Sequence, residues 1–213
     1  MEEEEKNSGI DTSCKLATAE TEFEIIQRAF PTEVKGEVNS LLTKFTVETK
    51  ISHEWGERVT LGQEIIVVPH RNYYNPPYSL LASKFSEVEK DILNCISSRN
   101  HNGYIRQKAI LNIINSNNYW TIPYIVRIIG EYVIEILNDI DNNFEIINKS
   151  NLTSFVKQNL EFHNRTRSRV GSYWHCYFRR QFPEILKGIR VPEEQRYVGF
   201  RLLNKIDKLV NDK

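Results

Sequence analysis

The chain has 213 residues, of which 40% are hydrophobic and 26% are charged. This composition argues against a disordered or fibrous protein, and the length is sufficient for a hydrophobic core that needs no disulfide bonds. Basic and acidic residues balance at 28 each, so the formal net charge is zero. The protein as a whole has no long-range attraction for nucleic acid or for an anionic membrane, and any such binding must depend on a local patch.

Cysteine usage and the amino-terminal residues bear on location. Cys14, Cys95 and Cys176 lie far apart and include no C-x-x-C pair. This usage is typical of a reducing compartment, and we predict a cytoplasmic location. Residues 1–20 are acidic and polar and resemble no secretory signal. We expect them to form a mobile acidic tail, followed by a single mainly helical domain over residues 21–213.

The most apolar stretch of the chain extends from Ile122 to Leu137. Arg127, Glu131 and Glu135 interrupt it, and charges in those places would be costly inside a lipid bilayer. The stretch is therefore predicted to be a buried helix, and no membrane is expected among the partners.

The first part of the domain, residues 21–78, is predicted to contain helix and a β-hairpin. Apolar residues recur at intervals of three and four between residues 22 and 48, which indicates an amphipathic helix interrupted at Pro31. Two β-prone runs then meet across Gly62-Gln63, a pair suited to a type II′ turn. The predicted hairpin covers about residues 53–69, and its core face carries Trp55, Val59, Leu61, Ile66 and Val68.

The second part, residues 79–213, is predicted to be helical throughout. Ser86 and Glu89 resemble an imperfect capping box at the start of a helix. Pro123 suits the first turn of a long central helix that is expected to reach Ile140. The expected fold is therefore mainly α, a compact multi-helix domain with one appended β-hairpin. Further helices are predicted over residues 105–114, 152–162, 170–178 and 198–210.

One segment of about 40 residues, 103–140, resembles a single helical hairpin of the HEAT type. In that family an Arg near the start of one helix, a small residue after it and a Pro opening the next helix recur. Arg106, Ala109 and Pro123 hold those places here. The resemblance implies a surface that binds other macromolecules rather than a catalytic pocket, although a solenoid needs several stacked repeats.

A basic and aromatic run in the carboxy-terminal third is a candidate nucleic-acid site. On a helix, guanidinium groups and aromatic rings would alternate along one side, an arrangement that can hold phosphates and stack bases. The alternative is structural, with the arginines paired to carboxylates such as Glu131, Glu135 and Asp139. The residues on that side are Arg165, Arg169, Tyr173, Tyr177 and Arg180.

Arg127, Glu131 and Glu135 are spaced four residues apart and would form one charged stripe on the central helix. Buried charges must be paired, so we expect a salt-bridge network here that includes a Glu131–Arg106 pair. Paired carboxylates can also bind metal or perform acid–base chemistry, but no Glu-x-x-His pair accompanies them on a predicted helix. No metal, cofactor or catalytic residue is predicted from them.

His53 and His70 are predicted to lie near each other at the open end of the hairpin. Two imidazoles can begin a zinc site, but the sequence indicates no further ligand. Phosphate-binding glycine loops and the common hydrolase and metalloprotease motifs are also missing from the sequence.

The leading hypothesis is a non-catalytic interaction or adaptor protein that binds another protein. Tyrosine-rich loops suit interfaces, and Tyr73, Tyr74 and Tyr78 are the predicted contact residues. A nucleic-acid-binding protein that uses the basic aromatic helix is the alternative, and an enzyme with a helical carboxylate site is the third hypothesis.

Overall fold

The computed structural model describes residues 22–44, 56–72 and 85–211 of the chain. Within them the protein is mainly α-helical with one two-stranded antiparallel hairpin, as predicted. The predicted acidic tail, His53, Trp55 and the tyrosine loop with Tyr73, Tyr74 and Tyr78 lie outside the described residues. Among the described residues, no helix is both long and apolar enough to cross a membrane.

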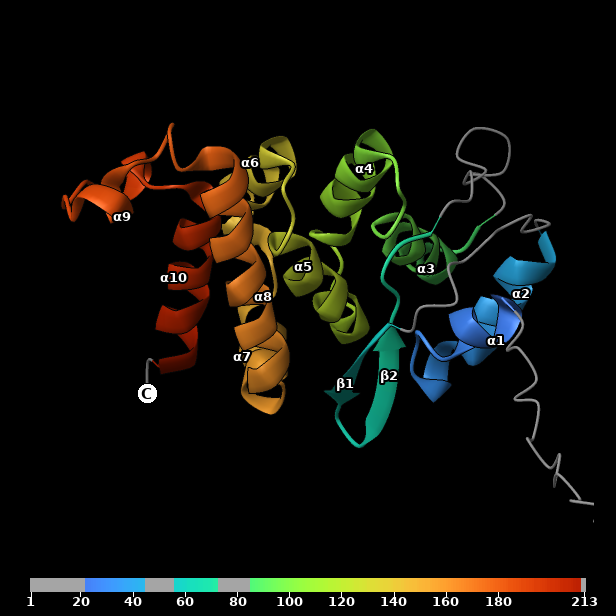
Figure 1. Cartoon of the computed structure of the whole chain (residues 1–213). Helices are drawn as coiled ribbons and strands as arrows, with labels where there is room; N and C mark the ends of the chain where they lie inside the picture. Colours follow the sequence, from blue (N-terminus) through green and yellow to red (C-terminus); the bar gives the residue numbers. More distant parts are fainter. Residues whose placement is uncertain (1–21, 45–55, 73–84, 212–213) are drawn as a thin grey trace, which may run out of the picture.

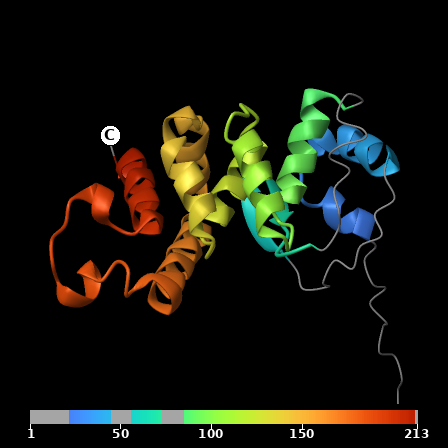
Figure 2. The ribbon, with the colours of Figure 1, turned by 90° about the horizontal axis from the view of Figure 1, so that it is seen from above.

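The helices are arranged along an elongated body, from α1 and α2 at one end to α9 and α10 at the other, and the hairpin lies near the middle (Figure 1). Figure 2, seen from above, shows the same order. Neighbouring helices make pairwise contacts: α2 packs on α3, α3 on α4, α4 on α6, and α6 on α10. The bounds are α1 Glu22–Gln27, α2 Lys35–Lys44, β1 Glu57–Leu61, β2 Glu64–Val68, α3 Glu87–Ser97, α4 Gly103–Ile113, α5 Ile122–Ile129, α6 Ile134–Asn142, α7 Lys149–Gln158, α8 Leu160–Tyr173, α9 Glu184–Lys187 and α10 Val198–Asn211.

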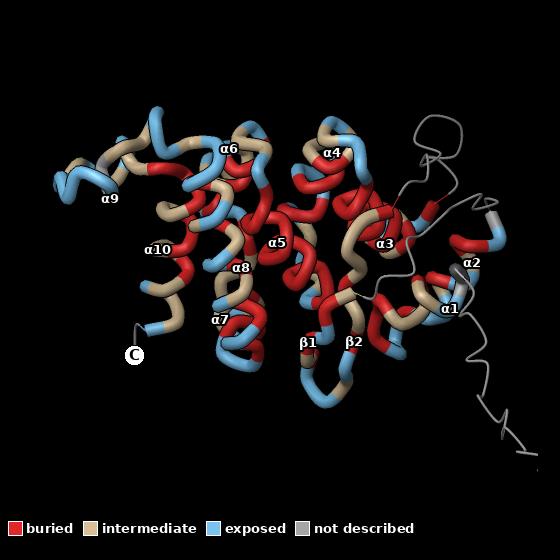
Figure 3. The backbone as a smooth tube through the Cα atoms, in the orientation of Figure 1, coloured by how far each residue is buried: buried red, intermediate tan, exposed pale blue. Residues whose placement is uncertain are grey.

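The centre of the core is α5, every residue of which is buried (Figure 3). It packs against α6, α7 and α8. At its amino-terminal end, the Tyr124 hydroxyl donates a 2.8 Å hydrogen bond to the Ala29 carbonyl oxygen, and the Tyr124 ring stacks on Phe30 at 5.7 Å between centroids. These contacts attach the amino-terminal helices to the rest of the body.

The hairpin confirms the predicted register and turn. Val59 faces Ile66, and Glu57 faces Val68. Gly62 has φ of 61° and no other residue of the turn has positive φ, a combination that fits a type II′ turn and not a type I′ turn. The described members of the predicted core face, Val59, Leu61, Ile66 and Val68, are all buried.

Both edges of the hairpin are tied to helices. On the β1 edge, Asn159 behaves like a strand residue, because its Oδ1 accepts from Thr60 N at 2.7 Å and its Nδ2 donates to Thr60 O at 2.8 Å. On the β2 edge, Val67 N donates to Arg28 O at 2.8 Å. Backbone groups at Thr60 and Val67 that a free hairpin would leave to solvent thus have protein partners, which holds both strands against the helical body.

The capping box at α3 is complete. Ser86 Oγ accepts from Glu89 N at 3.1 Å, and Glu89 Oε2 accepts in return from Ser86 N at 2.9 Å. A spacing of three residues is the one that this motif requires, so the predicted helix start is confirmed.

The predicted long central helix is wrong. It is divided, since α5 ends at Ile129, with Gly130 as its C-cap residue, and α6 begins at Ile134. At Gly130 a Cβ atom would lie only 3.2 Å from Cβ and Cδ of Arg169, so a glycine there allows α8 to approach closely. Because the helix ends there, Arg127, Glu131 and Glu135 do not form one stripe.

Two of the predicted helices near the carboxy terminus have other bounds, whereas the predicted helix 198–210 is confirmed as α10. In place of the predicted helices 152–162 and 170–178, α7 ends at Gln158, and α8 extends from Leu160 to Tyr173 and continues into a π-helical turn, Trp174–Phe178. The polar composition of α8 gives its first half little apolar pattern, since only a narrow strip that includes Phe162, Thr166 and Val170 is buried.

A glycine contact between α10 and α8 gives a stability prediction. A Cβ at Gly199 would lie 2.8 Å from both Val170 Cγ1 and Tyr197 Cε1, whereas a Cβ at Gly171 in α8 would meet nothing within 4 Å. We expect Gly199→Ala to lower the free energy of unfolding by about 1–3 kcal/mol through overpacking. We expect Gly171→Ala to raise it by roughly 0.5–1 kcal/mol through helix propensity. Urea denaturation measures both, and equal shifts in the two variants would contradict this packing.

Candidate functional site

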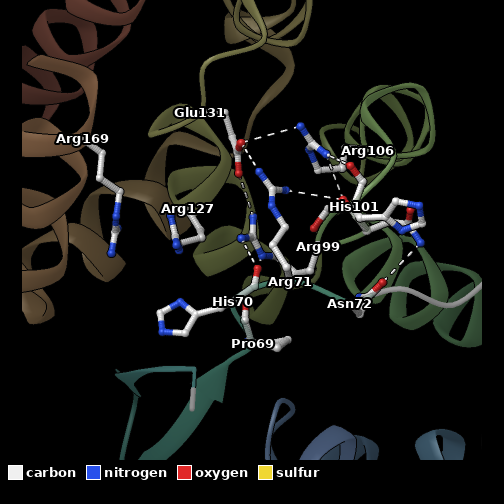
Figure 4. A network of polar contacts seen from close by, with 12 residues as sticks. Pro69, His70, Arg71, Asn72, Arg99, His101, Arg106, Arg127, Glu131 and Arg169 are labelled. Atoms are coloured by element: carbon white, nitrogen blue, oxygen red, sulfur yellow. Dashed lines mark hydrogen bonds and ion pairs between the residues drawn. The ribbon is translucent and has the colours of Figure 1, made fainter. Parts of the chain in front are cut away.

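Two buried carboxylates each form ion pairs with three arginine side chains. The first is Glu131, in the connection between α5 and α6. Its Oε1 lies 3.4 Å from Nη1 of Arg99, and its Oε2 lies 3.7 Å from Nη2 of Arg106. The same Oε2 accepts a hydrogen bond from Nη2 of Arg71. Figure 4 shows these three guanidinium groups converging on the carboxylate. The predicted Glu131–Arg106 pair is thus confirmed.

The second carboxylate is Glu57, at the start of β1. Its Oε1 pairs with Nη2 of Arg169 and lies 3.9 Å from Nε of Arg127. Its Oε2 lies 3.7 Å from Nε of Arg165. Strand β1 and helices α5 and α8 therefore meet at this side chain.

The eight side chains form one connected group, which we call the arginine network. Arg127 joins its two halves: it pairs with Glu57, and its charge and that of Glu131 act on each other. Arg165 also pairs with Glu161, one helical turn away. Within the part of the chain that the structure describes, six guanidinium groups thus face three carboxylates, and three positive charges are uncompensated. The arginine network therefore provides a local excess of positive charge, which a chain with zero net charge needs in order to attract an anion.

Backbone contacts fix the positions of the arginines near Glu131. Arg99 Nε donates to the Pro69 carbonyl oxygen at 2.9 Å, and its Nη2 donates to the His70 carbonyl oxygen. Arg106 Nη1 donates to the carbonyl oxygens of Asn100 and His101, both at 2.9 Å. The chain leaving β2 is therefore joined to the turn between α3 and α4.

A short parallel bridge strengthens that junction. Asn72 N donates to Arg99 O at 2.9 Å, and His101 N donates to Asn72 O at 2.8 Å. The guanidinium groups are thus placed by paired backbone rather than by free side-chain rotation, which lowers the entropy cost of ordering them on binding.

Burial makes the positive charge of the network costly. Arg99 and Arg106 are each only 1% exposed. Burial, followed by the neighbouring charge of Arg127, lowers the pKa of Arg99 to about 9. Burial is also the main cause that lowers the pKa of Arg106 and Arg127. A group whose pKa falls on burial has lost more solvation than its partners restore, so an added anion would stabilise it.

Several donors of the network are buried without a hydrogen-bond acceptor. Among the described residues these are the Nε atoms of Arg127 and Arg165, and also Nε and Nη2 of Arg106, whose guanidinium group has the Tyr132 side chain as a polar neighbour. Ion pairs longer than 3.6 Å reach Arg106 Nη2 and the Nε atoms of Arg127 and Arg165, but such distances are too long for hydrogen bonds. A buried donor without an acceptor costs free energy, and an oxyanion placed among these groups would supply acceptors.

Three tyrosines lie beside the network, and we call them the tyrosine cluster. Tyr132 follows Glu131 directly, Tyr173 ends α8, and Tyr177 lies in the π-helical turn. The ring centroids are 5.7 Å apart for Tyr132–Tyr173, 5.9 Å for Tyr132–Tyr177 and 6.2 Å for Tyr173–Tyr177. Tyr132 is 46% exposed and Tyr177 is 65% exposed. The network thus has a partly exposed aromatic border.

The tyrosine cluster and the arginine network are neighbours in the fold. Tyr132 follows Glu131 directly, and Tyr173 follows Arg169 by one turn of α8. Burial lowers the pKa of Arg106 and of Arg169, and the nearby side chains of Tyr132 and Tyr173 offset part of this lowering. Among these residues, the α5–α6 connection, α8 and the π-helical turn contribute exposed or partly exposed side chains, whereas Arg106 of α4 and Arg127 of α5 are buried.

Most residues of the predicted basic aromatic helix come together here. Arg165, Arg169, Tyr173 and Tyr177 all belong to the network or the cluster, while Arg180 is exposed and follows the π-helical turn, outside both. The arginines pair mainly with Glu57 and not with the carboxylates predicted for the structural alternative. Glu135 is exposed, and Asp139 accepts instead from Gln107 at 2.7 Å.

Sequence reasoning missed three members of the network, Glu57, Arg71 and Arg99. One signal was present: Glu57 shares the predicted core face of β1 with Val59 and Leu61, and a charge on a core face requires a partner. Nothing in the sequence distinguishes Arg71 or Arg99 from an ordinary surface arginine, because their partners come from other segments.

The predicted metal hypotheses receive no geometric support within the described ranges. No group of three or more metal-ligating side chains is found there. His70 takes part in the site through its carbonyl oxygen, which accepts from Arg99.

No protein-family model, no curated protein and no solved structure matches this chain.

The position of Glu131 gives a second stability prediction. Glu131→Gln keeps the shape of the side chain but removes the charge that three arginines share. Breaking a buried ion pair on one side typically costs about 3–5 kcal/mol, so we expect the free energy of unfolding to fall by roughly that amount. Urea denaturation at low ionic strength measures the change.

The matched control is Glu135→Gln, which removes the same charge from an exposed position four residues away. We expect a change within about 0.5 kcal/mol for that variant. If the two variants unfold at the same urea concentration, Glu131 does not hold the arginines together.

Proposed function

We propose that this protein binds nucleic acid, and that the arginine network and the tyrosine cluster together form its binding surface. The observation that carries the proposal is the excess of guanidinium groups over carboxylates, three of them partly exposed on Arg71, Arg165 and Arg169, next to partly exposed tyrosines. The proposed activity is binding, and no residue is assigned a catalytic role.

Phosphate is the anion that best fits this donor set. The planar guanidinium group presents paired N–H donors at a spacing that matches phosphate oxygens, and arginine is favoured over lysine where such paired contacts are made. Every basic residue of the network is an arginine. A sugar–phosphate backbone carries one negative charge per nucleotide, so it can neutralise several arginines in succession.

The arginines differ in accessibility, which suggests how contact is made. Arg165 is 41% exposed in its side chain, and Arg71 and Arg169 are partly exposed, so these three can reach a bound backbone directly. Arg99 and Arg106 are buried and contribute through their field and by holding Glu131. Uncompensated charge behind an exposed rim raises the local concentration of an anionic ligand.

The other hypotheses remain predictions. A protein-binding loop at Tyr73, Tyr74 and Tyr78 has no described geometry to support it, and the resemblance to a HEAT-type hairpin and the cytoplasmic location rest on sequence alone. Capture of a protein partner through that loop is compatible with nucleic-acid binding at the arginine network, since the two involve different residues.

A matched pair of substitutions on α8 tests the proposal. Arg165 faces Glu57 and the network, whereas Arg167 binds Asp207 of α10 through both carboxylate oxygens. The two side chains are almost equally exposed, at 41% and 43%. We expect Arg165→Gln to weaken binding of a fluorescent oligonucleotide roughly fivefold at about 0.1 M salt and to lower the log–log salt slope by about 1.

Arg167→Gln removes the same charge from the other side of the helix, and we expect its affinity and salt slope to match those of the wild-type protein. Fluorescence anisotropy across a salt titration provides both quantities, and circular dichroism checks that each variant is folded. Equal losses in the two variants, or binding that does not depend on salt, would contradict a phosphate-binding role for the network.

A further inference from the structure

The tyrosine cluster indicates which form of nucleic acid the surface takes. Resting on the proposed function, we infer that the ligand is an unpaired strand, whose bases stack on Tyr132 and Tyr177 while its phosphates contact the arginine network. This goes beyond backbone binding, because it assigns the cluster a role in distinguishing single strands from duplexes.

The cluster has the form of a stacking platform. Its three rings lie within 6.2 Å of one another by centroid distance, and the Tyr173 and Tyr177 rings are inclined by only 27°. Tyr173 is partly buried and contacts both other rings, while Tyr132 and Tyr177 present ring surface to solvent. Exposed aromatic surface is available to a planar ligand without rearrangement of the core.

Charge complementarity identifies the occupant. Tyr173 lies on the same helix as the partly exposed Arg165 and Arg169, one turn after Arg169, so an apolar planar group bound at the cluster would be joined to something anionic at the network. A nucleotide has this pattern, with a planar base on one side of the sugar and a phosphate on the other. Alternating aromatic rings and basic side chains are the arrangement that single-strand-binding surfaces use.

A duplex cannot use both features. In double-stranded nucleic acid each base is covered on both faces by its neighbours, so only the backbone and the base edges are accessible. A duplex would therefore contact the arginines and gain nothing from the tyrosines. An unpaired strand can turn its bases outward and add stacking to the phosphate contacts, so the cluster should favour single strands.

The experiment compares three fluorescent probes of equal length, about twelve nucleotides, which is within the usual site size of such surfaces. The probes are a DNA single strand, the same strand paired with its complement, and an abasic strand with the same number of phosphates. Stacking contributes about 1–3 kcal/mol per base, so we expect the single strand to bind between about 5-fold and 100-fold more tightly than the abasic strand. We expect the duplex to show no comparable gain over the abasic strand.

Variants then locate the effect. Replacement of Tyr132 and Tyr177 together by Leu keeps apolar surface but removes the aromatic faces, and we expect it to abolish the advantage of the single strand over the abasic strand. Replacement of both by Phe keeps the faces, and we expect it to preserve that advantage. Tyr119→Leu is the control, because Tyr119 is partly exposed but lies beside the carboxylates of Glu33 and Glu64.

Each outcome has a distinct meaning. If all three probes bind equally and the Leu variant is unchanged, while Arg165→Gln still weakens binding, stacking is overturned and the proposed function stands. If no probe binds, or only a phosphorylated or acidic peptide does, the proposed function itself is overturned.

A ribonucleotide version of the single strand, measured in parallel, shows whether the sugar matters, and equal affinity for both sugars is the result expected from stacking and phosphate contacts alone.

Discussion

The carboxylate of Glu131 is the interaction on which the arrangement of this protein depends most. Arg71 comes from the chain leaving β2, Arg99 from the turn after α3, and Arg106 from α4, and all three converge on it. One buried charge therefore joins the chain after the hairpin, the α3–α4 region and the α5–α6 connection, together with the backbone hydrogen bonds between Asn72 and the α3–α4 turn. Removing it would leave three guanidinium groups in a poorly solvated space without their shared partner.

The second buried carboxylate, Glu57, also pairs with three arginines. Glu57 is on the buried face of β1 and receives arginines from α5 and α8. Because Arg127 joins the two halves, the hairpin is bound into the helical body by charge as well as by the apolar contacts of Val59 and Ile66. Each carboxylate has more arginine partners than it can neutralise. Within the described part of the chain, the network therefore keeps a net positive charge in addition to its structural role.

Interruptions of regular structure create the candidate site. The chain turns at Gly130, just after α5. Of the next two residues, Glu131 pairs with the arginines and Tyr132 belongs to the tyrosine cluster. The π-helical turn after α8 places Tyr177 against the same cluster. A single uninterrupted helix from Pro123 to Ile140 would have carried Glu131 and Glu135 along one stripe and would not have formed this surface.

Local patterns in the sequence determined the mainly helical fold, the hairpin with its type II′ turn at Gly62 and the start of α3 at Ser86, because propensity, alternation of apolar residues and capping all act between near neighbours. The sequence also indicated that Arg165, Arg169, Tyr173 and Tyr177 share a helix face and that Glu131 pairs with Arg106. Only the tertiary structure decided that Glu57, Arg71 and Arg99 join them. The physical reason is that a buried charge is stabilised by whichever opposite charge the fold brings within a few ångströms, and that proximity depends on long-range packing that no local spacing encodes.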